Sequence, residues 1–235
     1  QNLQSKTQTE DVQKRNLRDK KLKSDHTDVS RYGTSYIVPW QDIPLTVANI
    51  SRMSMEQREE AVQYLFQYFR KGGFPYPQFT EEELKEDWNK LQSFDTSSVW
   101  SNIDGKTVIS CGSTTGVDLF KHFNPHFYTV SEDGKNKKSM LQVFEDDELL
   151  LKVLRNRLGI TFFYRGESFP FDITGNMIKQ GMRSMHLAPQ TSNFRATVAK
   201  ALYEKLLPEG GNIFDYSSGF NQRLLGAMSS SKNFK

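Results

Sequence analysis

The sequence predicts an α/β protein in which a mixed α+β region leads into the start of a parallel sheet. Three observations support this class. Two segments with capping residues carry apolar side chains at helical spacing. Short runs of β-branched and aromatic residues in the middle of the chain are typical of strands. Near the end, an apolar run ends in an acid and precedes a small-residue loop and another helical pattern, the order found at the edge of a parallel sheet.

The composition of the 235 residues is that of a folded protein. Aromatic residues make up 12% of the chain, which excludes full disorder because disordered chains are poor in them. No basic segment leads into an apolar run near the start, and no stretch approaches the roughly 20 apolar residues of a membrane span. We therefore expect a cytoplasmic protein with no membrane partner. The net charge of +3 permits a nucleic-acid partner without requiring one.

Three regions follow from the distribution of residue types. Residues 1–33 are a polar, partly basic arm, for which a solvated helix and a nucleic-acid-binding arm are both open interpretations. Residues 34–175 form a mixed α+β region. Residues 176–235 hold a helix, a strand, a loop and a second helix. Because the chain stops soon after this loop, we expect a truncated domain or one that a second chain completes.

The mixed region opens with a short extended segment over residues 36–40 and two helices. Ser54 can cap the first helix, and Lys71-Gly72-Gly73 ends it. Thr80 and Glu83 form a capping box at the start of the second. The apolar residues at helical spacing are Ala61, Val62, Leu65, Phe66 and Phe69 in the first helix and Leu84, Trp88 and Leu91 in the second.

Further along, apolar runs predict strands over residues 107–111, 127–130 and 160–164, with a turn at 133–134 after the second. A helix is expected over residues 144–158. The acids of residues 145–148 lie near its start, where the helix dipole favours negative charge, and we prefer this interpretation to a carboxylate metal site.

The most ordered pattern covers residues 193–228. A helix over 193–206 and a turn at 208–211 precede a short buried strand over 212–215, which ends in Asp215. Residues 216–221 form a small-residue loop, and a helix follows over 222–228. Small residues let a ligand approach the backbone closely, and the start of a helix offers N–H groups to a carboxylate or phosphate.

The loop sequence Asp215-Tyr216-Ser217-Ser218-Gly219-Phe220-Asn221 resembles the first motif of class I S-adenosylmethionine-dependent methyltransferases. It is most similar to the motif Asp-Pro-Phe-Ala/Met-Gly-Ser-Gly of DNA amino-methyltransferases. The acid and the central glycine match, and Asn221, which replaces the last glycine, tolerates a left-handed backbone. The resemblance implies a Rossmann-like sheet, S-adenosylmethionine as cofactor and DNA as partner. The cofactor-binding residues that it implies are Phe194, Arg195, Asp215, Ser217, Ser218, Gly219 and Asn221.

A second motif of that family, Asp/Asn-Pro-Pro-Tyr/Phe, is similar to Asn124-Pro125-His126-Phe127, where His126 replaces the second proline. The resemblance implies that the polar side chain and backbone carbonyl accept the hydrogens of the target amine, while the aromatic ring stacks on a flipped base. A permuted motif order accommodates its place ahead of residue 215. The alternative interpretation is a loop that leads into a strand. The overall order also resembles tailed-phage proteins with a methyltransferase-like domain, so the cytoplasm of a phage-infected bacterial cell is an expected location.

Other chemistries find less support. His122 and His126 lie near Cys111, but Pro125 disrupts a shared helical face and no fourth ligand is evident, so no metal site is expected. No phosphate-loop lysine follows Gly219. Basic and aromatic residues are interleaved in the third quarter of the chain, which suits DNA binding and an ordinary surface equally. These residues are Arg155, Arg157, Phe162, Phe163, Tyr164, Arg165, Lys179, Arg183 and His186.

The leading hypothesis is an S-adenosylmethionine-dependent DNA methyltransferase, or a fragment of one, that methylates a base nitrogen. The fold that the resemblance implies places an acid for the ribose hydroxyls about 20 residues after the motif, whereas only 14 residues follow Asn221. We therefore expect the isolated chain to be inactive. The alternative is a non-catalytic DNA-binding or assembly module that keeps a degenerate methyltransferase-like loop. Nothing in the sequence specifically favours a third class, another nucleotide-using enzyme.

Overall fold

The computed structural model describes residues 36–132, 137–159, 161–164, 167–170 and 172–235. The chain forms two compact units, each built from two segments. The first unit comprises Gln1–Gln78 and Tyr128–Gln190, and the second comprises Phe79–Phe127 and Thr191–Lys235. This division differs from the expected boundary at residue 175, because residues 79–127 fold together with the predicted cofactor region. The expected arm, residues 1–33, lies outside the described residues.

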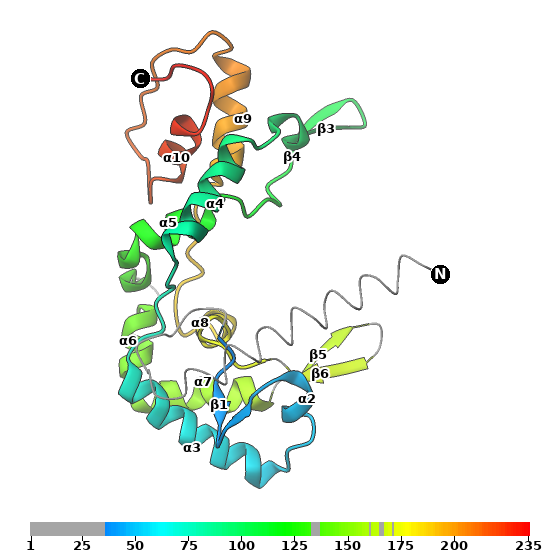
Figure 1. The fold of residues 1–235 in the computed structure, drawn as a ribbon, viewed down its shortest axis with the longest axis vertical. Helices are drawn as coiled ribbons and strands as arrows, with labels where there is room; N and C mark the ends of the chain where they lie inside the picture. Colours follow the sequence, from blue (N-terminus) through cyan, green and yellow to red (C-terminus); the bar gives the residue numbers. More distant parts are fainter. Residues whose placement is uncertain (1–35, 133–136, 160, 165–166, 171) are drawn as a thin grey trace. The chain divides into compact units, whose positions relative to one another are not determined.

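In its described residues, the first unit is built mainly from helices. Their bounds are α2 (Val47–Ile50), α3 (Met55–Gly72), α6 (Met140–Glu145), α7 (Asp147–Gly159) and α8 (Gly175–Ser184). The predicted start of α3 is confirmed, since the Ser54 hydroxyl accepts from the Gln57 N–H at 3.2 Å and the Gln57 side chain accepts from the Ser54 N–H at 2.9 Å. Gly73 ends the helix with a φ of +80°. α3 packs against α7 (Figure 1). Fully buried side chains from both helices enter the core.

The helix expected over residues 144–158 is two helices, α6 and α7. Asp146 separates them with an extended backbone (φ −82°, ψ 115°). Its carboxylate accepts hydrogen bonds from the Leu149 N–H at 3.1 Å and from Lys138 Nζ at 2.6 Å. The side chain therefore caps the start of α7, which makes the break favourable.

Two hairpins complete the first unit. β1 (Pro39–Trp40) pairs antiparallel with β2 (Ile43–Pro44), in agreement with the extended segment expected over 36–40. β5 (Thr161–Tyr164) pairs antiparallel with β6 (Glu167–Pro170), and β5 confirms the strand expected over 160–164.

The strand expected over residues 127–130 is wrong, because residues 125–129 form the 3₁₀ helix η2 (Pro125–Thr129). Proline has the backbone φ that a first helical residue requires, and the Phe127 N–H donates to the Asn124 carbonyl at 3.1 Å. The expected turn at 133–134 lies outside the described residues. Glu132 and Lys137, which flank it, form an antiparallel bridge.

The second unit contains the predicted cofactor region. Its elements are α4 (Glu81–Gln92), η1 (Thr96–Val99), β3 (Trp100–Ile103), β4 (Lys106–Ile109), α5 (Val117–Phe123), α9 (Ala196–Leu206) and α10 (Gln222–Met228). The capping box of Thr80 and Glu83 begins α4 as expected. β3 and β4 form an antiparallel hairpin, and β4 covers the strand predicted over 107–111 except for its last two residues. A small core of Val99, Val198 and Ala201 joins η1 to α9, and α10 packs beside α9 (Figure 1).

The described residues thus form a mixed α/β structure whose three sheets are each two-stranded and antiparallel. Their only parallel pairing joins residues 211–213 to 233–235. The Gly211 N–H donates to the Asn233 carbonyl at 3.0 Å, and the Lys235 N–H donates to the Gly211 carbonyl at 3.0 Å. The Ile213 N–H then donates to the Lys235 carbonyl at 2.8 Å.

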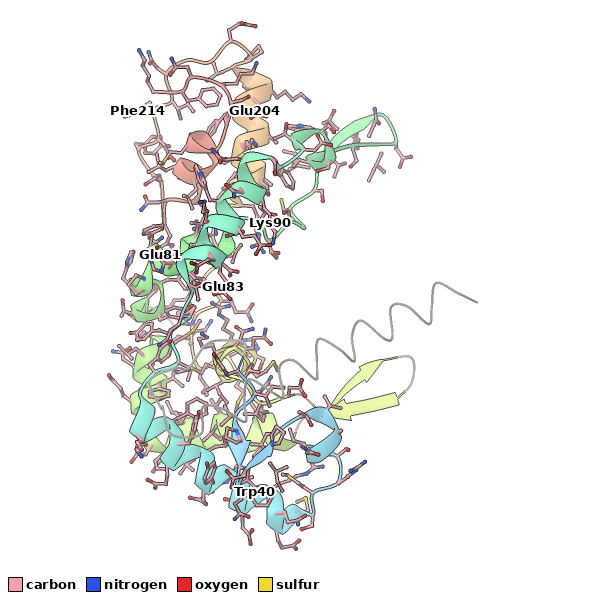
Figure 2. The ribbon with its side chains drawn as sticks, in the orientation of Figure 1. Trp40, Glu81, Glu83, Lys90, Glu204 and Phe214 are labelled. Atoms are coloured by element: carbon pink, nitrogen blue, oxygen red, sulfur yellow. The ribbon has the colours of Figure 1, made fainter. Side chains whose placement is uncertain are left out.

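The buried strand expected over residues 212–215 is therefore an extended segment paired along one edge, and it is not buried. Phe214 is labelled in Figure 2, and its side chain is 90% exposed. Burial of such a segment requires neighbours on both edges and both faces, which the described residues do not supply. None of their helices has the length and apolar character needed to cross a membrane.

Candidate functional site

The loop of residues 215–221 connects the extended segment to α10. Gly219 and Asn221 both have left-handed backbones, with φ of +60° and +63°. The left-handed conformation that the sequence allows at Asn221 is thus confirmed. α10 has seven residues, so we assign no anion site to its first turn.

An ion pair joins the two ends of this loop region. Arg223 Nε donates to Asp215 Oδ2 at 2.7 Å, and Arg223 Nη2 donates to Asp215 Oδ1 at 2.9 Å. The Ser217 N–H also donates to Oδ1, at 3.2 Å. The hydrogen bonds from Arg223, helped by the one from Ser217, lower the pKa of Asp215 from its usual 3.8. Asp215 is therefore a carboxylate whose two oxygens are both engaged.

The start of α9 is held against α10 at short range. The Gln222 side-chain oxygen accepts from the Ala196 N–H at 3.2 Å, which caps the first turn of α9. A Cβ atom on Gly226 would lie 2.6 Å from the Ala196 carbonyl oxygen, so only glycine allows the two helices to approach this closely. This contact fixes the residues just before α9 relative to the loop.

Three residues precede α9, and they differ in what they contact. The Asn193 side-chain oxygen accepts from the Phe194 N–H at 2.9 Å, and this oxygen is the nearest atom, at 3.6 Å, to a Cβ built on Gly219. Asn193 Nδ2 is buried and has no hydrogen-bond partner among the described residues. The Phe194 ring centroid lies 5.8 Å from the guanidinium carbon of Arg223. Arg195 is the N-cap of α9, without a side-chain capping bond.

A pocket of about 380 Å³ lies along the ion pair. Asp215, Ser218 and Asn221 are the predicted cofactor residues that line it, together with Arg223 and Tyr203. Burial and the charge of Asp215 raise the pKa of Tyr203 above its usual 10.0. The volume of the pocket is within the range of small-molecule sites, roughly 300–1,000 Å³. The other predicted residues, Phe194, Arg195, Ser217 and Gly219, are not among those that line it.

The predicted catalytic residues 124–127 lie in the same unit and contact the loop. The ring centroid of Phe220 is 5.1 Å from that of Phe127 and 5.4 Å from that of His126. Asn124 is 2% exposed, and its Nδ2 donates to the Phe120 carbonyl at 2.9 Å. Phe127 is 7% exposed, so in this structure its face is not open to a base, whereas Pro125 and His126 are exposed.

The interleaved basic and aromatic residues do not form one exposed stripe. Arg157 and Lys179 are buried, and Lys179 Nζ donates to the Pro75 carbonyl at 2.8 Å. Arg155 pairs with Glu59 through three hydrogen bonds of 2.8 to 3.1 Å. The side chains of residues 160–171 lie outside the described part.

Among the described residues, no three His, Cys, Asp or Glu side chains are grouped so as to hold a metal ion. The His122 ring lies against Phe123, with centroids 4.8 Å apart, while His126 contacts Phe220.

Sequence reasoning missed Asn193, Phe220 and Arg223 as parts of the site. A large aromatic side chain inside a small-residue loop could have indicated that Phe220 packs against another segment. Arg223 has no such local signal, because its partnership with Asp215 depends on the turn of the loop. Comparisons of the chain with protein-family models, with curated proteins and with solved structures find no match.

Proposed function

We propose that the second unit holds the S-adenosylmethionine site of a DNA amino-methyltransferase that methylates a base nitrogen in the cytoplasm of a phage-infected bacterial cell. The observation that carries this proposal is the contact of Phe220 with Phe127 and His126, at 5.1 and 5.4 Å. It brings the expected methyl-donor loop to the expected target-base motif, although the two are far apart in sequence. Methyl transfer requires donor and acceptor to be held close together, which this juxtaposition favours.

The direction of the chain around the loop also supports the proposal. An extended segment, the loop, α10 and a returning segment follow in order, and residues 211–213 pair in parallel with 233–235. In parallel α/β units, ligands bind beyond the carboxyl end of the strand, which is where Asp215 lies.

The residues present fit this cofactor. Asn193 Nδ2 is a buried donor without a hydrogen-bond partner among the described residues, although Asn193 does not itself line the pocket. Asp215, Ser218 and Asn221 would line its pocket, and the left-handed Gly219 would leave the backbone open beside Asn193. S-adenosylmethionine, when bound, supplies an electrophilic methyl group. Phe127 and Phe220 would hold the target-base motif against the loop.

Calorimetric titration of the chain with S-adenosylmethionine tests the proposal. We expect binding by the wild-type chain and binding weakened about tenfold in Asp215→Ala, the loss of one charged hydrogen bond. Asp147→Ala is the matched control, because Asp147 also pairs with an arginine, Arg70, at 2.6 Å but lies in the first unit. Absence of binding by the wild-type chain, or equal loss in both variants, would overturn the cofactor assignment.

A non-catalytic DNA-binding or assembly module is the second candidate. The burial of Asn124 and Phe127 favours it, because these side chains would have to contact the base in the enzyme. Retention on DNA that weakens steeply with salt, without S-adenosylmethionine binding, would support this function over the first.

A further inference from the structure

The ion pair between Asp215 and Arg223 uses only one edge of the guanidinium group and leaves its Nη1 without a hydrogen bond to another described residue. Resting on the proposed function, we propose that Arg223 binds the carboxylate of the ligand's amino-acid end and that Asp215 is the residue that positions Arg223. The acid of the motif then acts through the arginine.

The hydrogen bonds assign these two roles. Arg223 uses Nε and Nη2 for Asp215, and its Nη1 makes no hydrogen bond to another described residue. A guanidinium has five N–H donors in a rigid plane, so fixing one edge of the plane also sets the direction of the remaining donors. Asp215 has both oxygens engaged, by Arg223 and by the Ser217 N–H.

A neighbouring aromatic ring restricts the arginine further. The guanidinium carbon of Arg223 lies 5.8 Å from the Phe194 ring centroid, within the range of a cation–π contact. Asp215 and Phe194 thus hold the Arg223 side chain from two separate segments of the chain. An arginine that is held in this way loses little conformational entropy when it binds a carboxylate.

The pocket has more cationic than acidic side chains, which favours a carboxylate as the ligand group that Arg223 contacts. Arg223, Lys232 and Lys235 line it with Asp215 as the single acid, which leaves an excess of positive charge. Leu224 and Phe234 supply apolar surface in the same pocket. S-adenosylmethionine also carries an ammonium and a sulfonium cation, so its carboxylate is the group that these cationic side chains would hold.

Three ligands separate a carboxylate contact from a general effect on the fold. S-adenosylmethionine carries the carboxylate, decarboxylated S-adenosylmethionine lacks only that group, and methylthioadenosine lacks the whole amino-acid end. Their dissociation constants are measured by calorimetry for the wild-type chain, Arg223→Gln, Arg223→Lys and the control Arg70→Gln. Arg70 pairs with Asp147 in the first unit.

We expect Arg223→Gln to weaken S-adenosylmethionine about tenfold, the loss of one charged hydrogen bond, and to leave the other two ligands within about twofold. Arg223→Lys keeps the charge and should restore part of the loss, whereas Arg70→Gln should change no constant. If Arg223→Gln weakened the binding of all three ligands equally, Arg223 would have only a structural role. That result would overturn this inference while the cofactor proposal stands. Displacement of S-adenosylmethionine by inorganic phosphate, dependent on Arg223, would overturn it in favour of a phosphate site. Absence of binding by every ligand to the wild-type chain would instead reject the proposed function itself.

Discussion

The rings of Phe127 and Phe220 meet edge to face, with centroids 5.1 Å apart and planes at 74°. Phe120 completes the cluster, 5.2 Å from Phe127 and 6.1 Å from Phe220. This aromatic cluster connects the predicted target-base motif to the predicted cofactor loop.

Phe220→Ala is expected to lower the free energy of unfolding by about 2 kcal/mol, since Phe220 is partly buried and loses its aromatic partners. Denaturant unfolding measures this change. A double-mutant cycle of Phe127→Leu and Phe220→Leu should give a coupling of about 0.5–1.5 kcal/mol, the range of aromatic pairs. Additive effects of the two substitutions would show that the rings do not interact in solution.

Gly226→Ala is expected to destabilise the protein by about 1–3 kcal/mol through overpacking. The added Cβ would lie 2.6 Å from the Ala196 carbonyl oxygen and 2.7 Å from Ala199 Cβ, and neither is a flexible side-chain end. Gly112→Ala is the matched control in the same unit, because its Cβ would meet only Ser110 Oγ at 3.9 Å. Similar unfolding midpoints for the two variants would contradict the close approach of α9 and α10.

Lys200→Met should cost about 3 kcal/mol of stability. Lys200 is 3% exposed, and its Nζ donates to the carbonyls of Leu91, Gln92 and Phe94 at 3.0, 2.6 and 3.4 Å. Methionine fills the space but leaves these carbonyls at the end of α4 without their donor, and each lost partner for a buried group costs about 1–3 kcal/mol.

Lys205→Met is the comparison for that substitution, since the exposed Lys205 contacts only the Trp100 ring, at 3.9 Å, among the contacts described for its ammonium group. Its expected cost is below about 1 kcal/mol. Thermal unfolding of both variants distinguishes them. An equal shift of the two unfolding temperatures would show that the hydrogen bonds from Lys200 to the end of α4 do not stabilise the protein.

The contribution of Asp215 to stability should depend on pH in one direction. Its pKa is lowered in the folded protein, chiefly by the hydrogen bonds from Arg223, from an ordinary value of 3.8. The unfolded chain therefore binds this proton first as the pH falls, so the stabilisation is complete above about pH 5 and is lost as the pH falls through the folded-state pKa. Urea unfolding at several pH values should show the difference between wild type and Asp215→Asn shrinking only below about pH 5. A difference that shrinks between pH 8 and 5 would implicate another group.

Local features of this fold could be predicted from the sequence because their causes are local. Ser54 and Thr80 cap their helices through residues three positions away, and both capping boxes form. The bounds of α10 and the left-handed Asn221 also follow from neighbouring residues.

Features that depend on distant segments could not be predicted in this way. Asp146 splits a continuous helical pattern because Lys138 and the Leu149 N–H hold its carboxylate. The apolar run over 127–130 suits a strand, yet Phe127 packs on Phe120 and Phe220 in a 3₁₀ helix. The candidate site shows the same division. The conformation of the loop depends on neighbouring residues, whereas its contact with residues 124–127 joins segments that are distant in the sequence.

Hydrogen exchange measured by mass spectrometry, with and without S-adenosylmethionine, tests the central assignment most directly. We predict slower amide exchange over residues 191–223 in the presence of the ligand and unchanged exchange over residues 137–159 of the first unit. Protection that is absent over 191–223, or that appears only in the first unit, would contradict the assignment of the Asp215–Asn221 loop as a cofactor site.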